Sequence, residues 1–371
     1  MEIKVKQKNN LSIIDKLQRF KDKRVSIVDL LVFCTEENCS DLYIKVDEFP
    51  YISVFGNILR LDCAPTTKGD WSEFYDNYVK NEYNKDYVRQ KTFDLSISVV
   101  TPETSPLYAT DRLLRYRANL SFSEGLNICT FRMIRPEPPT FDTINYPAEC
   151  KDVLEMAMKD RSAITLFTGP TGSGKSTSYA ACINSFTKQG GVLDNKVIIT
   201  LEDPIEYQFH STDTCKITQK EMRKDFLSFG DGVISALREH PNCINVGEIR
   251  GKQEISALVE AARTGHQVAS TIHSSDVAST IARLMYYLDS DSMVLYDLLV
   301  HMKLIISQRL IKSNNAYIVD CQYVYFTDEV TKNLLDVVNH GDNVQLAIMD
   351  MFTNEKLINN KTVKNFTYEE K

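Results

Sequence analysis

The sequence has no long apolar run and no excess of positive charge. None of its apolar segments approaches the roughly 18 residues that cross a bilayer. The basic N-terminal segment has no apolar core like that of a signal peptide. The formal net charge of −7 gives no bulk attraction to nucleic acid or to anionic lipid. We therefore expect neither a membrane span nor a secretion signal, and no direct nucleic-acid partner.

A cysteine pairing pattern is also missing. The nine cysteines are scattered without a C-x-x-C pair, and the two closest in sequence are Cys34 and Cys39. This spacing is typical neither of a disulfide framework nor of a zinc site. We expect buried free thiols in a reducing cytosol.

At 371 residues the chain is long enough for two domains. Residues 1–136 mix helical and alternating patterns and predict a small α+β domain. Apolar residues recur at helical spacing in two groups, Leu11, Ile14, Leu17 and Phe20, then Ile27, Leu30, Leu31 and Cys34. The tyrosine-rich stretch WSEFYDNYVKNEY predicts a further helix. DLYIKV, YISVFG and FDLSISVV predict strands, and a hairpin is expected around Glu124-Gly125.

A proline-rich segment, RPEPPTFDTINYP, predicts a linker over residues 137–147, because its four prolines fit neither a helix nor a central strand. From 148 to 371 apolar strands alternate with amphipathic helices, which predicts a doubly wound α/β domain with a mostly parallel sheet. One helix has an apolar stripe from Ile255 to Ala262 and Gly265 at its C-terminal cap. Past about Lys332 the pattern is less regular, and NNKTVKNFTYEEK is expected to be a polar, frayed tail.

The segment GPTGSGKST fits the phosphate-loop pattern G-x-x-x-x-G-K-[ST] between an apolar strand and a helix. Its glycines let backbone N–H groups turn toward a polyphosphate at a helix N-terminus. Lys175 is expected to bridge the β- and γ-phosphates of ATP, and the Ser176 hydroxyl to ligate Mg²⁺. The expected nucleotide-binding residues are Gly169, Pro170, Thr171, Gly172, Ser173, Gly174, Lys175, Ser176 and Thr177.

Other predicted strands also end in chemically active side chains. Acidic residues follow KVIITL at Glu202, Asp203 and Glu206, and Glu248 follows a second apolar run. QVASTIH ends at His273, and His266 directly precedes this segment. Because open α/β sheets bind ligands beyond the C-terminal ends of their strands, we expect these groups to converge on the phosphate loop.

Several motifs of the chain, taken together, resemble those of a known family. GPTGSGKST, LEDPIEY, ISALREHPNCINVGEIRG, EAARTGHQVASTIHSSD and IISQRLI resemble, in this order, the secretion and pilus-retraction ATPases of the type II/type IV family. The resemblance is to the PilT-like branch, including the DotB-like ATPases of type IVB secretion, and it extends to CSDLYIKV, RYRAN and FRMI in the first domain. It implies a PAS-like N-terminal domain, a RecA-like ATPase domain and a homohexameric ring.

The resemblance also implies residue roles. Glu202 corresponds to the catalytic glutamate, and Glu248 to the Walker B glutamate that supports Mg²⁺ through water. His266 and His273 match a histidine box that links the phosphate site to neighbouring elements. A carboxylate aimed at free water can orient it for in-line attack, which agrees with the role of Glu202.

Three arginines of the first domain are further candidates. In the family, the arginines of the RYRAN-like segment, here Arg115 and Arg117, reach a neighbouring subunit's nucleotide. For Arg132 two roles stay open: contact with a neighbouring subunit's nucleotide, or that of a surface arginine on a strand. Two positions depart from the family pattern: Asn245 replaces an apolar residue, and Gly251 replaces an Asp that could pair with Arg250. A buried unpaired amide would cost a few kcal/mol.

The expected function is that of a cytoplasmic hexameric ATPase, recruited by inner-membrane components of a secretion or pilus machine. Type IVB secretion is favoured over pilus retraction. A RecA-like nucleic-acid motor is an alternative. It predicts basic grooves with stacking aromatics, and the acidic charge balance of the chain argues against it. A small-molecule kinase would need a lid and an acceptor pocket, for which the sequence offers no candidate.

Overall fold

The computed structural model describes most of the chain and divides it into two compact units. The first unit comprises Met1–Pro136 with Pro204–Gln208, and the second Glu137–Asp203 with Phe209–Lys371. The described residues are 15–54, 57–80, 92–103, 105, 113–134, 137–288, 292–313, 316–340, 346, 350–351 and 363–365. The predictions for Leu11 and Ile14, and for the last residues of the tyrosine-rich stretch, lie outside the described residues.

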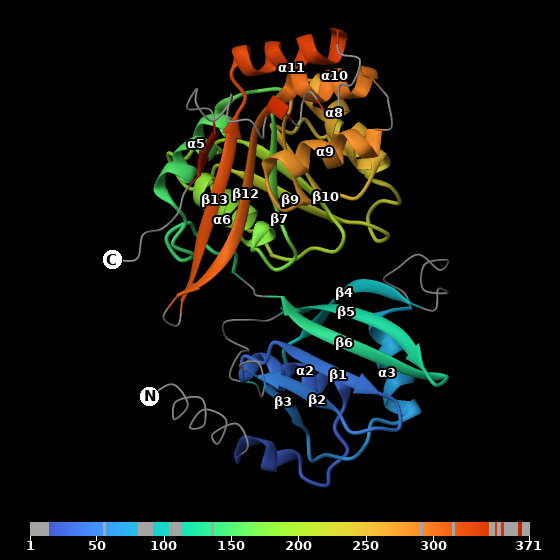
Figure 1. Ribbon diagram of the computed structural model, residues 1–371. Coiled ribbons are helices and arrows are strands. Elements are labelled where there is room, and N and C mark those ends of the chain that lie inside the picture. The colour runs from blue at the N-terminus through green and yellow to red at the C-terminus, as the bar shows by residue number, and fades with distance from the viewer. Residues whose placement is uncertain are drawn as a thin grey trace. The chain divides into compact units, whose positions relative to one another are not determined.

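The first unit is built on an antiparallel six-stranded sheet with the order β3-β2-β1-β6-β5-β4 (Figure 1). Its strands are β1 (Asp41–Lys45), β2 (Tyr51–Val54), β3 (Asn57–Arg60), β4 (Phe93–Val100), β5 (Leu113–Ser123) and β6 (Leu126–Ile134). Its helices are the 3₁₀ helix η1 (Gln18–Phe20), α2 (Ile27–Glu36) and α3 (Lys68–Tyr78). The predicted hairpin is confirmed, since Glu124 and Gly125 both have positive φ angles between β5 and β6.

One face of this sheet is buried beneath α2 and α3. Alternate residues of β5 are buried, and the Tyr116 hydroxyl donates to the Leu31 carbonyl of α2 at 2.5 Å. Phe74 of α3 packs edge-on against Phe131 of β6, with ring centroids 5.3 Å apart. The opposite face therefore carries the polar residues of these strands, including the three candidate arginines.

The second unit contains an eight-stranded sheet with the order β14-β13-β12-β7-β11-β10-β8-β9. Neighbours from β12 to β9 are parallel, which confirms the predicted mostly parallel sheet. The strands are β7 (Ile164–Gly169), β8 (Val197–Glu202), β9 (Lys216–Glu221), β10 (Cys243–Ile249), β11 (Gln267–His273), β12 (Met302–Ser313), β13 (Ala316–Tyr325) and β14 (Val363–Asn365).

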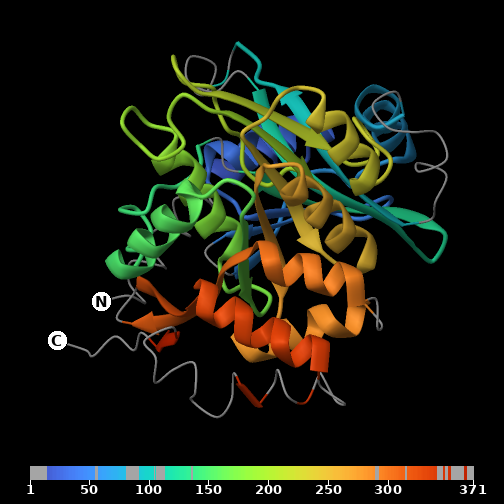
Figure 2. The ribbon, with the colours of Figure 1, turned by 90° about the horizontal axis from the view of Figure 1, so that it is seen from above.

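Helices cover both faces of this sheet. On one face, Ile164 and Leu166 of β7 belong to the core formed with α7, α8 and α9, whereas Phe167 contacts the Tyr179 ring of α6 on the other. Helices α10 and α11 lie side by side beyond α8 (Figures 1 and 2). The helices are α5 (Ala148–Lys159), α6 (Lys175–Phe186), α7 (Phe229–Leu237), α8 (Lys252–Arg263), α9 (Val277–Leu288), α10 (Ser292–His301) and α11 (Asp328–His340).

The C-terminal part is more regular than its sequence pattern indicates. Helix α11 continues past Lys332 to His340, with Val330 and Leu334 buried. Within the expected polar tail, Val363–Asn365 forms β14 and pairs with β13. The prediction of a frayed tail is therefore wrong for these three residues, because backbone pairing with an edge strand needs no apolar pattern.

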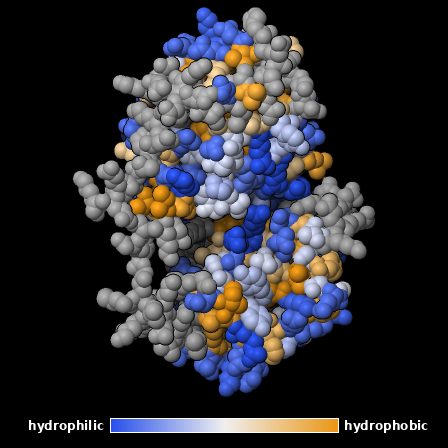
Figure 3. Space-filling view, in the orientation of Figure 1, coloured by the Kyte–Doolittle hydropathy of each residue, from blue (hydrophilic) through white to orange (hydrophobic). Residues whose placement is uncertain are grey.

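The surface and the thiols agree with the compositional expectations. The visible face of each unit is mainly hydrophilic, with scattered apolar patches (Figure 3). All nine cysteines are free and buried, as predicted. Among the described residues, no helix combines the length and the apolar character that a bilayer crossing requires.

Candidate functional site

The phosphate-loop segment joins β7 to α6 and leaves the first turn of the helix open. The N-cap residue Gly174 has φ 83° and provides no side-chain cap. Gly172 also has a positive φ, at 78°. These conformations favour glycine, and an uncapped helix start leaves backbone N–H groups for an anionic ligand. The local structure therefore fits the predicted phosphate-binding turn.

The loop is packed against β12. A Cβ at Gly169 would lie 2.2 Å from the Gln308 carbonyl oxygen, so only glycine fits there. The Gln308 side chain donates from Nε2 to the Ser173 carbonyl at 2.8 Å. Gln308 is a residue whose part in the site the sequence analysis missed, although it lies within the IISQRLI motif.

Lys175 is buried at the start of α6 and turns back onto its own loop. Its Nζ donates to the carbonyls of Gly169 and Pro170, at 3.0 Å each. It also lies 3.1 Å from Nδ1 of His273, at the end of β11. A single ammonium group therefore links the loop to the neighbouring strand.

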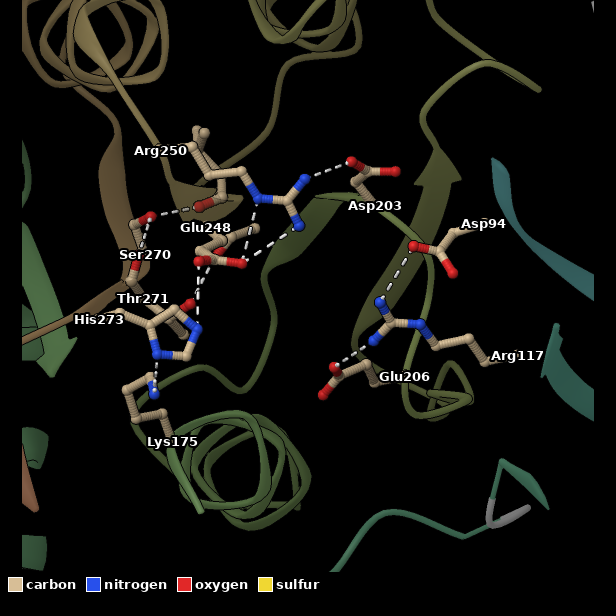
Figure 4. Close-up of polar contacts among 12 residues, drawn as sticks. Asp94, Arg117, Lys175, Asp203, Glu206, Glu248, Arg250, Ser270, Thr271 and His273 are labelled. Atoms are coloured by element: carbon tan, nitrogen blue, oxygen red, sulfur yellow. Dashed lines mark hydrogen bonds and ion pairs between the residues drawn. The ribbon is translucent and has the colours of Figure 1, made fainter. Parts of the chain in front are cut away.

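His273 continues this link to Glu248. Its Nε2 lies 3.2 Å from Oε1 of Glu248 (Figure 4). Burial lowers the pKa of His273, and the nearby Lys175 charge lowers it further, against the opposing effect of Glu248. A neutral ring that accepts from Lys175 at Nδ1 must carry its proton on Nε2 and donate it to the carboxylate.

Arg250 binds the same carboxylate and connects it to a second acid. Its guanidinium contacts Glu248 Oε2 at 3.2 Å and Asp203 Oδ2 at 2.9 Å (Figure 4). Burial alone would lower the pKa of Arg250, but Glu248 and Asp203 raise it overall. Arg223 also pairs with Asp203. Arg250 thus has two acidic partners despite Gly251, the position where the family pattern has an Asp.

A bulge in β10 sets the position of Glu248. The register with β11 shifts between Val246 and Glu248, so Gly247 is the extra residue. A Cβ at Gly247 would lie 2.9 Å from the Leu201 carbonyl of β8. The Gly247 carbonyl accepts from the Thr271 hydroxyl at 3.0 Å. The bulge explains why a glycine precedes Glu248. Gly247 lets the backbones of β10 and β8 approach closely, just before the carboxylate.

Glu202, the last residue of β8, is held by two neutral side chains. Thr200 Oγ1 donates to its Oε1 at 2.6 Å, and Gln219 Nε2 donates to the same oxygen at 2.9 Å. Neither partner was identified from the sequence. Both bonds are made to one oxygen, which fixes the rotation of the carboxylate.

The ends of β7, β8, β10 and β11 therefore bring together Lys175, His273, Glu248 and Glu202, as expected, but not His266. His266 precedes β11, at the opposite end of the strand from His273. Its Nδ1 lies 3.2 Å from the Ala261 carbonyl at the end of α8. The expectation that His266 reaches the phosphate site is corrected for the single chain, because a whole strand separates the two histidines.

The three candidate arginines lie in the first unit on neighbouring strands. Arg117 of β5 is the register partner of Arg132 of β6. Arg117 contacts Asp94 at 3.6 Å and Glu206 at 3.8 Å (Figure 4).

The other two arginines also have partners within this unit. Arg132 bonds to Asp41 at 2.9 Å. Arg115 donates to the Ser96 hydroxyl at 3.4 Å. Within one chain, all three therefore take part in local contacts of the first unit, and their expected role at a neighbouring subunit's nucleotide stays a prediction.

The available ligands fit a Mg²⁺ ion that is shared with a nucleotide. Among the described residues no cluster of three or more His, Cys, Asp or Glu could hold a metal alone. Ser176 and Glu248 provide a hydroxyl and a carboxylate, and Mg²⁺ is commonly held by one or two protein oxygens together with substrate phosphates and water. Their assignment as metal ligands remains a prediction.

A phosphate-binding turn at the edge of a parallel sheet, with carboxylates on the adjacent strands, defines a nucleotide-binding α/β protein. The model of the type II/IV secretion system protein family matches residues 117–365, and the chain belongs to this family.

Relatives in the family are ATPases by name. The type IV pilus retraction ATPase PilT of Pseudomonas aeruginosa is 29% identical over 342 residues, which cover 88% of this chain and 92% of that protein. The X-ray structure of the Legionella pneumophila ATPase DotB is 28% identical with a TM-score of 0.73, covering 93% of this chain and 91% of that one. The pilus retraction motor PilT with bound ADP is 25% identical with a TM-score of 0.71, covering 90% of each chain.

The bulge can be tested with Gly247→Ala. We expect the added Cβ to push β8 and β10 apart at the Leu201 carbonyl, with a loss of about 1–3 kcal/mol of stability and a roughly 10-fold lower ATPase rate through displacement of Glu248. Thermal unfolding and steady-state ATPase assays measure both. Gly230→Ala is the matched control, because its Cβ would meet nothing closer than the Ser228 hydroxyl at 3.8 Å. Equal activity of the two variants would contradict a role of the bulge.

Proposed function

We propose that the protein hydrolyses ATP with Mg²⁺ and thereby powers a type IV secretion machine, of the type IVB class. The observation that carries this proposal is the continuous contact from Lys175 through His273 to Glu248, with Glu202 on the next strand beyond Glu248. It supplies a cation and two carboxylates beside a phosphate-binding turn. Membership in a family whose named relatives are ATPases supports the same reaction.

Lys175 and Ser176 would bind the nucleotide. When phosphates bind, Lys175 would exchange its carbonyl partners for β- and γ-phosphate oxygens, and the Ser176 hydroxyl would face the metal. Mg²⁺ would supply charge neutralisation for the transferred group. Glu248, with one oxygen toward His273 and the other toward Arg250, would accept a hydrogen bond from a metal-bound water.

Glu202 would orient the attacking water and accept its proton. Thr200 and Gln219 both donate to Oε1, and these bonds would orient the carboxylate toward a substrate water. Thr200 and Gln219 are neutral donors, so their bonds do not offset the negative charge as the Arg250 guanidinium does at Glu248. This difference supports the separate roles proposed for the two carboxylates.

The proposal includes the architecture of the working assembly. Residues 1–136 form a PAS-like domain and 148–371 a RecA-like domain, joined through 137–147. Six copies close into a ring by a head-to-tail contact. In this ring, Arg115 and Arg117 face the γ-phosphate of a neighbour, and Arg132 stays with Asp41 or joins them. The ring works at the cytoplasmic face of the inner membrane, recruited by membrane components of the machine.

Pilus retraction is the second candidate function. It is favoured by the similarity to the pilus retraction ATPase PilT, at 29% identity, which matches the 28% identity to DotB. The two machines are distinguished in the source cell. A chromosomal Lys175→Ala substitution that stops protein translocation supports the secretion proposal, whereas loss of pilus-driven movement with normal translocation contradicts it.

The nucleotide site is tested with purified Lys175→Ala. Because Lys175 is the cation within the loop, ATP affinity should fall and hydrolysis should drop by about 100-fold or more. Nucleotide titration and phosphate release measure the two effects. Lys188→Ala, at an exposed lysine beyond the end of α6, should bind and hydrolyse ATP normally. Normal turnover by Lys175→Ala would show that the loop is not the site.

The roles of the carboxylates are tested by two glutamine variants. Glu202→Gln should keep ATP and Mg²⁺ bound while hydrolysis falls by about 10²–10⁴-fold, because an amide cannot accept the proton of water. Glu248→Gln should weaken the Mg²⁺ dependence as well as turnover. If Glu202→Gln is fully active and Glu248→Gln is inactive with normal metal binding, the assignment is reversed.

Sharing of the site between subunits is tested by mixing two inactive proteins. Arg115→Ala/Arg117→Ala rings and Glu202→Gln rings should each assemble with little activity. In mixed rings, some interfaces pair an intact Glu202 with intact arginines, so activity should exceed both parents and peak at intermediate ratios. Native mass spectrometry confirms mixing. Mixed rings without activity above the parents, together with a nucleotide-bound structure that shows no guanidinium at the γ-phosphate, would contradict the trans-acting arginines.

A further inference from the structure

A row of polar residues crosses the interior of the second unit's sheet. The register of the parallel strands aligns one residue from each of five neighbours, namely Thr165 of β7, Ala269 of β11, Asn245 of β10, Thr200 of β8 and Gln219 of β9. Register partners in a sheet share a face, so these side chains lie on one side. Strands buried on both faces are normally apolar throughout. Three buried polar residues in this row, Thr165, Asn245 and Thr200, therefore call for a physical explanation.

Three buried polar atoms on this face have no hydrogen-bond partner among the described residues. They are Thr165 Oγ1, Asn245 Oδ1 and the Tyr179 hydroxyl of α6. Their residues are exposed by 0%, 3% and 5%, respectively. An interior polar atom without a partner is costly, and such atoms are commonly satisfied by a buried water with two to four polar partners.

Tyr179 lies over the same face as the polar row. Its ring centroid is 5.9 Å from that of Phe167, which follows Thr165 by two residues and so shares its face. Burial raises the pKa of Tyr179, and smaller contributions from Cys243 and Glu202 raise it further. Both groups therefore lie within electrostatic reach of the hydroxyl. Cys243 precedes Asn245 by two residues on the same face.

The row leads directly to the proposed catalytic carboxylate. Thr200, the register partner of Asn245, uses its hydroxyl proton to donate to Glu202 at 2.6 Å. Its oxygen can still accept a hydrogen bond. The small side chain of Ala269, between Thr165 and Asn245, adds no bulk above the middle of the row.

We propose that Tyr179 and Asn245 hold a buried water that fixes Thr200, and through it Glu202, so that both act as positioning residues for hydrolysis. The water accepts from the Tyr179 hydroxyl and donates to Asn245 Oδ1 and Thr200 Oγ1, whose residues are register partners on the adjacent strands β10 and β8. This inference rests on the proposed role of Glu202. It gives a function to Asn245, a polar residue at a position where the family pattern is apolar.

The test removes the hydroxyl while keeping the ring. Tyr179→Phe should lower kcat about 3- to 10-fold, without a change in KM for ATP, because the nucleotide contacts stay intact while Glu202 loses its support. Asn245→Val should have a similar effect. Since both act through one water, the double variant should be no slower than the slower single variant. A high-resolution crystal structure should show the water between Tyr179 and Asn245.

Tyr146→Phe is the matched control. Tyr146 is also buried, but its hydroxyl lies beside Cys321 of β13, five strands away from β8 in the sheet order. Its loss should leave kcat and KM unchanged. A purely structural role of Tyr179 would change thermal stability in the same way as in this control and would not change kcat.

Failure of this inference is distinguishable from failure of the proposed function. If Glu202→Gln hydrolyses ATP normally, the role of Glu202 is wrong and the inference falls with it. If Glu202→Gln is inactive but Tyr179→Phe and Asn245→Val both keep the wild-type kcat, only the positioning network is overturned. Independent, multiplicative losses in the double variant would also overturn the shared water. In the Glu202→Gln background, Tyr179→Phe should not lower the residual rate further.

Discussion

Four neighbouring parallel strands end at one edge of the sheet, and the rest of the site depends on how their charges are paired there. Lys175 contacts two backbone carbonyls and a neutral histidine. Glu248 is shared between that histidine and Arg250. Charged groups at partly buried positions are stable only when each has a partner. The chain of contacts from Lys175 to Arg250 meets this requirement.

The carbonyl and imidazole contacts of Lys175 matter for the proposed binding of phosphate. A direct ion pair would have to be broken before the lysine could bind phosphate, whereas carbonyl and imidazole partners can be exchanged at lower cost. His273 can also stay in contact with Glu248 when Lys175 turns to a ligand. The neutral state of this histidine, caused first by burial and then by the lysine charge, makes the exchange electrostatically mild.

The parallel core and the glycine-rich turn between β7 and α6 could be predicted from the sequence because both depend on short, local patterns. The sequence also placed Glu202, Glu248 and His273 at strand ends, since an apolar run followed by a polar residue marks an end. The sequence motif grouped His266 with His273, but the two residues lie at opposite ends of β11 and are therefore a strand length apart.

Long-range contacts explain what else the sequence analysis missed. The bulge at Gly247 is set by the Leu201 carbonyl of a different strand. Gln308 contacts the phosphate-binding turn from β12, far along the chain, and Arg250 pairs with Asp203, which follows the neighbouring strand β8. No spacing rule encodes such pairs. The unpaired amide of Asn245 was foreseen as costly, but its alignment with Thr165 and Thr200 needed the strand register.

The chain connection next to Glu202 suggests how hydrolysis couples to motion in the proposed ring. Glu202 and Asp203 belong to the second unit, whereas Pro204–Gln208 groups with the first. Within that segment, Glu206 contacts Arg117, which also pairs with Asp94. A neighbour's phosphate that attracts Arg117 would compete with Glu206 for the guanidinium. Glu206 lies in a segment that begins two residues after Glu202, so in the proposed ring the arginine contact would act next to the proposed catalytic carboxylate.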